Sequence, residues 1–562
     1  MRPYFLRCVA LAATLLLLFL ALLGEAKIVV SSKSKNLTTD ESWIEAKWSC
    51  VVCTFVVALL SQLKQLHEVP SEEALKIFCD FFSFLEYAVC RFASILFRGA
   101  LPLIDANKTA DVVCQTLRYC ENTKCHLFPL GYDTVSVSSL RRMYRLEHVE
   151  PINVCAVVPK LCLMEDSELR PELDADGDLF STRFTRRGGE WRGRDCDDND
   201  PTVYPGRNTL DAVKDENCNG IFGVDNVTGK TYEEMWCRNS SPMGVIALGD
   251  SVTAHFGIPQ DFVAVHELSH DAFAHFTHIV GNGFDWPMLS AITGFAKVSK
   301  YKPNRQGPMK SVYKELVKRN KCNHRDYQNL GVNGATTARL TEMMDFVARD
   351  RTKSVKPAIL FFAMIGNDVC DRPPEVTTPA EYYANLTAAL EKAEALLPAG
   401  SHVLILPVSD GRVVYDEMHN RTHPIGSLHN DVSYTEFYDF LNCVDISPCW
   451  GWLNSNETVR DATWEAAQSL NAQIPRILNE SAAKFKNIQV HALDDVVASM
   501  LGLFDGPLWE LIESVDGFHP SQLGTALLGE LLFNKTVELG IIPPANPFNN
   551  DISERFGDQG GY

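Results

Sequence analysis

The chain of 562 residues has too few basic side chains to balance its acidic ones. Lysine and arginine number 52 against 71 aspartates and glutamates, which gives a formal net charge of −19. Proteins hold nucleic acids largely through cationic contacts to phosphates, so this deficit argues against a nucleic-acid partner. Beyond the N-terminus the sequence also lacks an apolar run long enough to span a bilayer. With 46% apolar and 22% charged residues, its composition is that of a globular protein of several domains.

The one long apolar run lies near the N-terminus, at residues 8–23, "CVALAATLLLLFLALL". Arg2 and Arg7 precede its core, and the small residue Ala26 ends the following "GEA". This order is typical of a secretory signal peptide, which we predict over residues 1–26; a membrane anchor is the alternative. Residues 27–44 are polar and aperiodic, and we interpret them as a pro-segment. We expect a protein of the secretory pathway, secreted or lysosomal.

Cysteines and glycosylation motifs agree with that compartment. Loss of Cys8 with the signal peptide would reduce the 17 cysteines to an even number, which suits disulfides in an oxidising environment. Asn-x-Ser/Thr motifs are frequent, as expected for a glycosylated surface. The predicted glycosylation sites are Asn36, Asn107, Asn226, Asn239, Asn385, Asn420, Asn456, Asn479 and Asn534.

Residues 45–126 combine helical periodicity with six regularly spaced cysteines. The stretches "CTFVVALLSQLKQL" and "EALKIFCDFFSFLEYAVCRFASILF" repeat apolar residues at intervals of three and four, which indicates amphipathic helices. The cysteines follow as Cys50-x2-Cys53, Cys79-x10-Cys90 and Cys114-x5-Cys120, and spacing alone leaves their pairing open.

This segment resembles a saposin-like domain over its whole length. The resemblance implies four or five helices held by the disulfides Cys50–Cys120, Cys53–Cys114 and Cys79–Cys90. It also implies lipid or membrane-surface binding, for which the large apolar residues between the cysteines are candidates. Filling the core of the module is their alternative role. These residues are Phe78, Phe81, Phe82, Phe84 and Leu85.

Residues 127–150 are interpreted as a linker in which Arg141-Arg142 is a possible processing site. Residues 151–237 follow, rich in Asp, Asn, Gly and Cys and poor in apolar runs. Alternating Asp and Asn near Gly is the pattern of a calcium loop, because oxygen ligands must converge where the backbone turns sharply. The EF-hand pattern is incomplete, since no Glu stands at its twelfth position, and the motifs better resemble thrombospondin type 3 repeats.

We therefore predict structural Ca²⁺ in this region, with a solvated acidic linker as the alternative. Cys196 and Cys218 lie among the acidic clusters, as in modules that rely on ions and disulfides in place of a core. The candidate ligands are Asp174, Asp176, Asp178, Asp195, Asp197, Asp198, Asn199, Asp200, Asp215, Asn217 and Asn219.

Residues 240–545 alternate strand-like and helix-like segments, which predicts an α/β domain, and residues 546–562 form a polar C-terminal tail. Within this domain "HELSH" at 266–270 suggests a zinc peptidase, with His266 and His270 as ligands and Glu267 as base. The extended zinc motif needs Gly at 273 and His at 276, but both positions are Phe. Zinc peptidase activity is therefore kept only as a weak alternative.

A serine hydrolase is favoured by four separate blocks. "GVIAL" is strand-like and ends at Gly249-Asp250-Ser251, where α/β sheets place functional groups. "NLGVNGATT" offers the backbone N–H of Gly334, and "AILFFAMIGND" offers the side-chain amide of Asn367. "DGFHP" places Asp516 and His519 three residues apart, so that Asp516 can orient the imidazole.

In this order the blocks resemble the GDSL or SGNH hydrolase family. The resemblance implies a three-layer α/β/α sandwich with a largely parallel sheet, Ser251 as nucleophile, His519 as base and Asp516 as its partner. It implies an oxyanion hole formed by the Ser251 and Gly334 N–H groups and the Asn367 amide. The sequence departs from the family in one place, because Ile365 stands where Gly usually begins the third block.

An all-α saposin-like module, a loop-rich calcium linker and an SGNH hydrolase in one chain resemble the acyloxyacyl hydrolase family. "GRDCDDNDPTVYPGR", "CNHRDYQN", "AMIGNDVC", "VDGFHP" and "FGDQGG" carry the likeness. It implies release of secondary fatty acids from the lipid A of lipopolysaccharide, which would detoxify it. It also implies small and large subunits joined by a disulfide, for which Cys125, Cys155 and Cys162 are candidates. A phospholipase or acyltransferase on glycerolipids and a non-enzymatic lipid carrier are the alternatives.

Overall fold

The computed structural model describes residues 39–83, 90, 99–122, 124–129, 136–146 and 169–562. The chain divides into two compact units, Met1–Ile44 and Glu45–Tyr562. Several predicted features lie outside the described residues. These are the signal peptide, residues 27–38 of the pro-segment, Asn36, Phe84, Leu85, Cys155 and Cys162.

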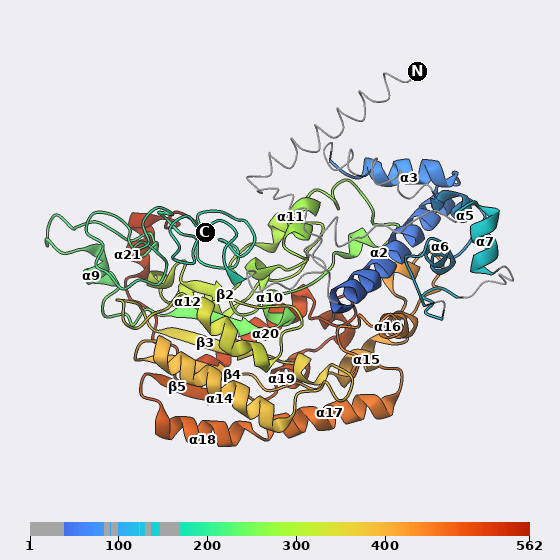
Figure 1. Cartoon of the computed structure of the whole chain (residues 1–562). Coiled ribbons are helices and arrows are strands. Elements are labelled where there is room, and N and C mark those ends of the chain that lie inside the picture. Colours follow the sequence, from blue (N-terminus) through green and yellow to red (C-terminus); the bar gives the residue numbers. More distant parts are fainter. Residues whose placement is uncertain (1–38, 84–89, 91–98, 123, 130–135, 147–168) are drawn as a thin grey trace. The chain divides into compact units, whose positions relative to one another are not determined.

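A five-stranded sheet lies at the centre of the C-terminal part (Figure 1). Its order is β2-β1-β3-β4-β5, and every neighbouring pair is parallel. The predicted largely parallel sheet is thus confirmed. The strands are β1 (Gly244–Gly249), β2 (Tyr327–Asn329), β3 (Ala358–Ala363), β4 (Ser401–Ile405) and β5 (Ile488–Ala492).

Helices cover both faces of the sheet because the central strands are apolar on both sides. Along β1, Ile246 and Leu248 belong to one core cluster, while Val245 and Ala247 belong to the other. The first cluster includes side chains of α14 (Pro379–Leu396), α17 (Glu457–Asn471) and α18 (Ile474–Lys484). The second includes those of α12 (Val312–Arg319), α19 (Val496–Leu503) and α20 (Gln522–Glu538). The result is the expected α/β/α sandwich.

The C-terminal part also contains shorter helices. They are α9 (Tyr232–Trp236), α10 (Ser251–Ala254), α11 (Phe276–Gly281), α13 (Leu340–Met343), α15 (Arg412–Met418), α16 (Tyr434–Cys443) and α21 (Asn549–Phe556). Helix α16 begins at a capping box, in which the Ser433 hydroxyl accepts from the N–H of Glu436 and the Glu436 carboxylate accepts from the N–H of Ser433.

The N-terminal module is helical, with α2 (Thr39–Leu66), α3 (Ser71–Asp80), α5 (Leu101–Asp105) and α6 (Ala110–Thr116). Its cysteines pair as Cys50–Cys120, Cys53–Cys114 and Cys79–Cys90, the pairing that the saposin-like resemblance implied. Among the described residues, Lys47–Leu66 is long and apolar enough to cross a membrane, so the expectation that no such run lies beyond the N-terminus was wrong, but 61% of it is buried in the fold. That burial is typical of a core helix.

Phenylalanines of the module pack against the hydrolase instead of facing solvent. The rings of Phe78, Phe81 and Phe82 all contact Phe273, with the Phe82 and Phe273 centroids 4.5 Å apart. Phe55 contacts His423. In this structure the three described candidates for lipid contact therefore lie in a half-buried aromatic interface. The sequence could not reveal it, because the periodicity of apolar residues does not record how two domains meet.

The short helix α7 (Val137–Met143) contains the basic pair proposed for processing. Arg141 is buried, and it donates hydrogen bonds to the carbonyls of Thr116 (2.6 Å) and Leu146 (2.7 Å). These bonds tie the pair to the folded module.

The acidic region is docked on the open edge of the sheet at β2. The Asn329 N–H donates to the Trp191 carbonyl (2.7 Å), and the Gly193 N–H donates to the Tyr327 carbonyl (2.9 Å). Arg192 is fully buried and donates to the side chain of Gln328. Covering an edge strand in this way satisfies its backbone groups and blocks pairing with other chains.

The C-terminal tail is also engaged. Gln559 is buried and donates to the carbonyls of Asn219 (2.6 Å) and Lys321 (3.1 Å). Arg325 donates to the carbonyls of Gly560 and Gly561. The last residues thereby fasten the acidic region to the hydrolase.

Candidate active site

Ser251 stands where β1 ends and the short helix α10 begins. The Asp250 carboxylate accepts the N–H of Val252 (2.9 Å) with one oxygen and the N–H of Ile365 (3.0 Å) with the other. Asp250 thus ties the serine turn to the end of β3. Gly249 is required for close approach, because a Cβ there would lie 2.0 Å from the Thr253 hydroxyl. Burial raises the pKa of Asp250 to about 6, which fits a structural carboxyl.

Ser251, His519 and Asp516 form one chain of hydrogen bonds. The Ser251 Oγ lies 2.7 Å from His519 Nε2, and His519 Nδ1 lies 2.8 Å from Asp516 Oδ2. The other Asp516 oxygen accepts the N–H groups of Phe518 (2.8 Å) and His519 (3.0 Å). Burial works to raise the pKa of Asp516, but the adjacent imidazole and these N–H groups outweigh it, so that the pKa lies below its usual value. The carboxylate is therefore ionised at neutral pH.

Three side chains from residues 423–438 hold the loop that carries Asp516. Tyr434 donates to the carbonyl of Ser514, and Tyr438 donates to that of Gly517 (2.5 Å). His423 Nε2 lies 2.6 Å from the Val515 carbonyl, while the Ile425 N–H donates to its Nδ1. Burial lowers the pKa of His423 to about 4, so the ring is neutral and donates from Nε2. No sequence pattern predicts these contacts, because all three side chains bond to backbone carbonyls that lie 79 to 92 positions away along the chain.

The opposite end of the same loop is fixed by a buried ion pair between Glu513 and Arg305. The Glu513 N–H donates to the His519 carbonyl (2.7 Å), and the Gly517 N–H donates to the Glu513 carbonyl (3.0 Å). Such closed turns keep the imidazole facing the serine.

The residues expected to form the oxyanion hole lie on two connected loops. Asn367 begins the 3-10 turn Asn367–Val369 after β3, and its Nδ2 donates to the Ala335 carbonyl (3.0 Å). Gly334, next to Ala335, is exposed and has φ +74°, in the left-handed region that favours glycine. Asp368 accepts from the N–H and hydroxyl of Thr337, which links the two loops further.

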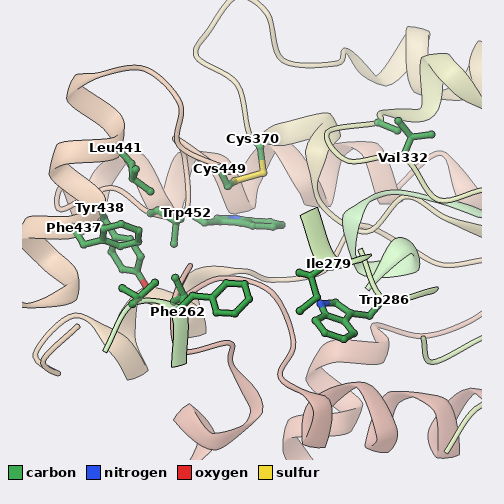
Figure 2. Packing of buried hydrophobic residues seen from close by; sticks show 14 of the residues in the cluster. Phe262, Ile279, Trp286, Val332, Cys370, Phe437, Tyr438, Leu441, Cys449 and Trp452 are labelled. Carbon is green, nitrogen blue, oxygen red and sulfur yellow. A yellow bond between two sulfur atoms is a disulfide. The ribbon is translucent and has the colours of Figure 1, made fainter. Parts of the chain in front are cut away.

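An apolar pocket opens beside Ser251 and His519. Trp452 forms part of its wall and lies against Gly366 and Gly411, where a Cβ would come within 3.2 Å and 2.1 Å of the indole. Figure 2 shows this indole near the Cys370–Cys449 disulfide, which joins its segment to the Asn367 loop. The other apolar lining residues include Val252, Ile365, Val414, Val497, Met500, Leu501, Leu508 and Phe518.

The "HELSH" segment does not form a helix. His266 and His270 are exposed in a turn, and Glu267 accepts a hydrogen bond from Gln260 (2.6 Å). Two histidines share a helical face only when a helix is present, so the geometry that suggested zinc ligation is missing here.

Five of the predicted calcium ligands form one cluster. Asp174, Asp176 and Asp198 have carboxylate oxygens within 4.8 Å of one another, as do Asp176, Asp178 and Asp195. One oxygen each of Asp176, Asp178 and Asp195 is buried without a hydrogen-bond partner among the described residues. Burial, followed by the neighbouring carboxylates, raises the pKa of Asp178 to about 8 and that of Asp195 to about 6. Converging unpartnered oxygens fit a hard cation.

A second acidic group contains Asp215, Asn217 and Asn219, together with two residues that the sequence analysis missed. The Asn217 and Asn219 amides donate to the Glu233 carboxylate at 2.7 and 2.5 Å. Asp211 accepts the N–H groups of Glu216 and Asn217, and burial and then Glu233 raise its pKa to about 7. Asp211 lies only four residues before Asp215 and could have been included, whereas Glu233 on α9 has no motif spacing.

The remaining predicted ligands lie in the turn between these groups. Asp197 and Asn199 belong to it, and the Asn199 N–H donates to the Asp197 carbonyl (2.7 Å). Asp200 instead forms an ion pair with Lys214 (2.8 Å) and accepts from Thr202. The Cys196–Cys218 disulfide joins the two acidic groups.

Most predicted glycosylation sites in the described residues are exposed. Asn385 is half-buried, and its amide donates to Thr337 (3.3 Å). The exposed sites are Asn107, Asn226, Asn239, Asn420, Asn456, Asn479 and Asn534.

Three family models match successive parts of the chain. The GDSL-like lipase/acylhydrolase family matches residues 245–532, the saposin-like domain matches residues 49–162, and a metal-binding motif matches residues 195–222. A family 3 carbohydrate esterase of Clostridium thermocellum covers 96% of its own length and 53% of this chain, at 13% identity, with a TM-score of 0.23. That score is too low to carry an argument.

Three curated relatives cover almost the full length. The acyloxyacyl hydrolases of Oryctolagus cuniculus and Homo sapiens are each 38% identical over 92% of this chain and 94% and 93% of theirs. That of Mus musculus is 36% identical over 92% of this chain and 93% of its own. The chain therefore belongs to the acyloxyacyl hydrolase family and is a lipid ester hydrolase of the GDSL type.

Proposed function

We propose that this hydrolase releases the secondary, acyloxy-linked fatty acids from the lipid A of bacterial lipopolysaccharide. The observation that carries the proposal is the hydrogen-bonded series Ser251–His519–Asp516 at the mouth of an apolar pocket. Two of the curated acyloxyacyl hydrolases are 38% identical to this chain over 92% of its length. This similarity supports the acyloxyacyl ester as the bond that is cleaved.

In the proposed mechanism, Ser251 attacks the ester carbonyl carbon while His519 Nε2 takes the hydroxyl proton. Ionised Asp516 holds the proton on Nδ1, which leaves Nε2 as the acceptor, and stabilises the imidazolium that forms. His519 then gives its proton to the departing alkoxide oxygen of the β-hydroxyacyl chain, which leaves as a hydroxyl group. Water, deprotonated by His519, attacks the acyl-serine and releases the fatty acid with regeneration of the serine.

The oxyanion of each tetrahedral intermediate is assigned to the N–H groups of Ser251 and Gly334 and to the Asn367 amide. One Asn367 amide hydrogen is used on the Ala335 carbonyl, so the other is the donor for the substrate. Removing one such donor costs about 3 kcal/mol of transition-state stabilisation in serine hydrolases.

The main energetic cost of such a substrate is the transfer of its acyl chains from the lipid aggregate into water. An apolar pocket and a lipid-binding module would both lower this cost. Drawing an acyl chain from an aggregate into water costs about 0.8 kcal/mol for each methylene. The pocket beside Ser251 offers the acyl chain that is transferred to the serine a surface of valine, leucine and methionine side chains instead of water. We assign the saposin-like module to the remaining chains of the amphiphile.

The substrate is tested by mass spectrometry of products from lipopolysaccharide and from phosphatidylcholine vesicles at equal acyl concentration. We expect free fatty acids from the secondary positions and lipid A that keeps its β-hydroxyacyl chains. Fatty-acid release from the vesicles alone would favour the glycerolipid phospholipase or acyltransferase. Absence of turnover on both would favour a lipid carrier.

The zinc-peptidase alternative makes a separate prediction. The double variant His266→Ala/His270→Ala is expected to keep ester hydrolysis within about twofold of the native rate, because exposed surface substitutions rarely disturb a distant site. The rate is measured with and without a zinc-selective chelator. A loss above tenfold in either case would restore a role for "HELSH".

The acidic cluster is proposed to hold structural Ca²⁺. Asp174, Asp176, Asp178, Asp195 and Asp198 would supply the first set of oxygen ligands, and their unpartnered buried oxygens support this assignment. Asp211, Asp215 and Glu233, with Asn217 and Asn219, would supply a second. The ion would neutralise carboxylates that the fold brings together and take no part in ester cleavage.

We also propose that proteolysis between the saposin-like module and the acidic region yields two subunits that stay covalently joined. Cys125 is bonded to Cys443 at the end of α16 (Cα–Cα 5.5 Å), which supports Cys125 as the linking cysteine among the three candidates. The secreted or lysosomal destination of the mature protein remains part of this proposal.

A further inference from the structure

The departure from the GDSL pattern at Ile365 has a structural counterpart in the active-site pocket. Ile365 follows β3 and is 8% exposed. Its N–H donates to Asp250 (3.0 Å), and its carbonyl accepts the N–H of Ser409 (3.0 Å). The backbone is therefore held from both sides, and the position of the side chain is fixed relative to the serine turn.

A second, smaller cavity lies behind the pocket that opens beside Ser251. The residues around it are apolar except Thr253, and they include Ala291, Leu406 and Leu528. Two residues, Val252 and Ile365, line both cavities. These two side chains therefore form the partition between the substrate pocket and the second cavity.

The partition lies close to the scissile bond. Val252 directly follows the nucleophile, and Ile365 comes two residues before Asn367. An acyl group bonded to Ser251 would place its first carbons, beyond the carbonyl, against these side chains. The far end of the chain would instead lie among the α19 residues Val497, Met500 and Leu501.

We propose that Ile365 is a specificity-determining residue that restricts the site to acyl groups unbranched at carbons 2 and 3. This inference rests on the proposed role of Ser251 and of the adjacent pocket. A glycine at this position, as in the usual third block, would leave the pocket continuous with the second cavity. The isoleucine side chain fills that connection and would meet a methyl branch on carbon 2 or 3.

The experiment compares kcat/KM for the 4-nitrophenyl esters of hexanoic, 2-methylhexanoic and 3-methylhexanoic acids in the full chain. In Ile365→Ala, the kcat/KM of each branched ester divided by that of the straight ester is expected to rise by at least 10-fold. Discrimination by one methylene in an apolar pocket is about 10- to 200-fold. The double variant Ile365→Ala/Ala291→Leu, which refills the second cavity, is expected to return the ratio toward the native value.

Leu406→Ala is the matched control, because it enlarges the second cavity and leaves the partition in place. Its ratio is expected to stay within twofold of the native value. If Ile365→Ala does not fold, as judged by its melting temperature, Ile365→Val makes the same test with an expected three- to fivefold rise. A ratio unchanged in the folded Ile365 variant, or raised equally in Leu406→Ala, overturns the inference.

Ser251→Ala separates this inference from the function on which it depends. If Ser251→Ala still hydrolyses the straight ester, the serine mechanism fails whatever the ratios are. If it is inactive and the Ile365 ratio is unchanged, only the specificity inference fails.

Discussion

Ester hydrolysis by the Ser251→Ala variant is expected to fall by a factor of about 10⁴ to 10⁶ in kcat, as in other enzymes whose serine acts together with a histidine. The Ser251 hydroxyl is bonded to His519 Nε2 at 2.7 Å, and in the proposed mechanism the proton is transferred through this contact. Its removal leaves His519 and Asp516 in place. The variant is therefore expected to melt within a few degrees of the native protein.

Asp516→Asn is expected to lose about 10⁴-fold with the fold intact, because an amide in place of the carboxylate favours the wrong imidazole tautomer. Ser427→Ala is a suitable control, since the Ser427 hydroxyl is buried with no hydrogen-bond partner among the described residues. Rates are measured as fatty-acid release from lipopolysaccharide and as hydrolysis of a soluble ester. Activity of Ser251→Ala within tenfold of native on either substrate would contradict the proposed nucleophile.

The parts of the site that could be predicted are those whose chemistry is local in sequence. A strand that ends in Gly-Asp-Ser, and an Asp three residues before a His, each have one plausible use in a hydrolase. The structure brings Ser251 and His519 together across 268 positions. The loop support from His423, Tyr434 and Tyr438 could not be predicted, because each of them bonds to a backbone carbonyl, and carbonyls are the same in every residue.

In the fold, too, local sequence patterns predict some features and leave others unpredicted. Apolar runs that end in functional loops predicted a parallel sheet, but no local pattern predicts its order β2-β1-β3-β4-β5. The phenylalanines at 78, 81 and 82 look like lipid contacts while the module is considered alone. Their half-buried interface with Phe273 depends on how two domains meet, which sequence periodicity does not record. The contribution of Glu233 to the acidic group could not be predicted for a related reason, because this residue lies on a helix outside the Asp-rich motifs.

Removing divalent cations with EGTA is expected to lower the melting temperature by about 5 to 10 °C at pH 8. An ion bound far above its dissociation constant contributes about 2 to 4 kcal/mol of stability, which corresponds to several degrees for a domain of this size. Activity is expected to disappear in parallel with unfolding and to remain normal below the new transition. The shift is measured by scanning calorimetry, with calcium and then magnesium added back.

The pH dependence of this shift has a defined sign. The pKa of Asp178 is about 8 in the ion-free fold, mainly because of burial and then because of neighbouring carboxylates, and that of Asp195 is about 6. In the unfolded chain both lie near 4. A carboxyl with a raised pKa in the fold destabilises the ion-free protein increasingly as pH rises from about 4 to 8. Bound Ca²⁺ removes this penalty, so EGTA should have a small effect at pH 5 and a large one at pH 8.

Two variants make the test specific to the cluster. Asp178→Asn removes one buried charge, so the ion-free protein should be more stable at pH 8 than the native ion-free protein, with weaker calcium binding. Asp200→Asn should keep the native response to EGTA, because Asp200 is paired with Lys214 outside the cluster. A melting temperature that does not change with EGTA at either pH, in protein shown by elemental analysis to contain no metal, would reject calcium. The buried carboxyls of the cluster would then be neutralised by protonation alone. In that case Asp178→Asn would stabilise the protein at pH 8 with no effect on ion binding.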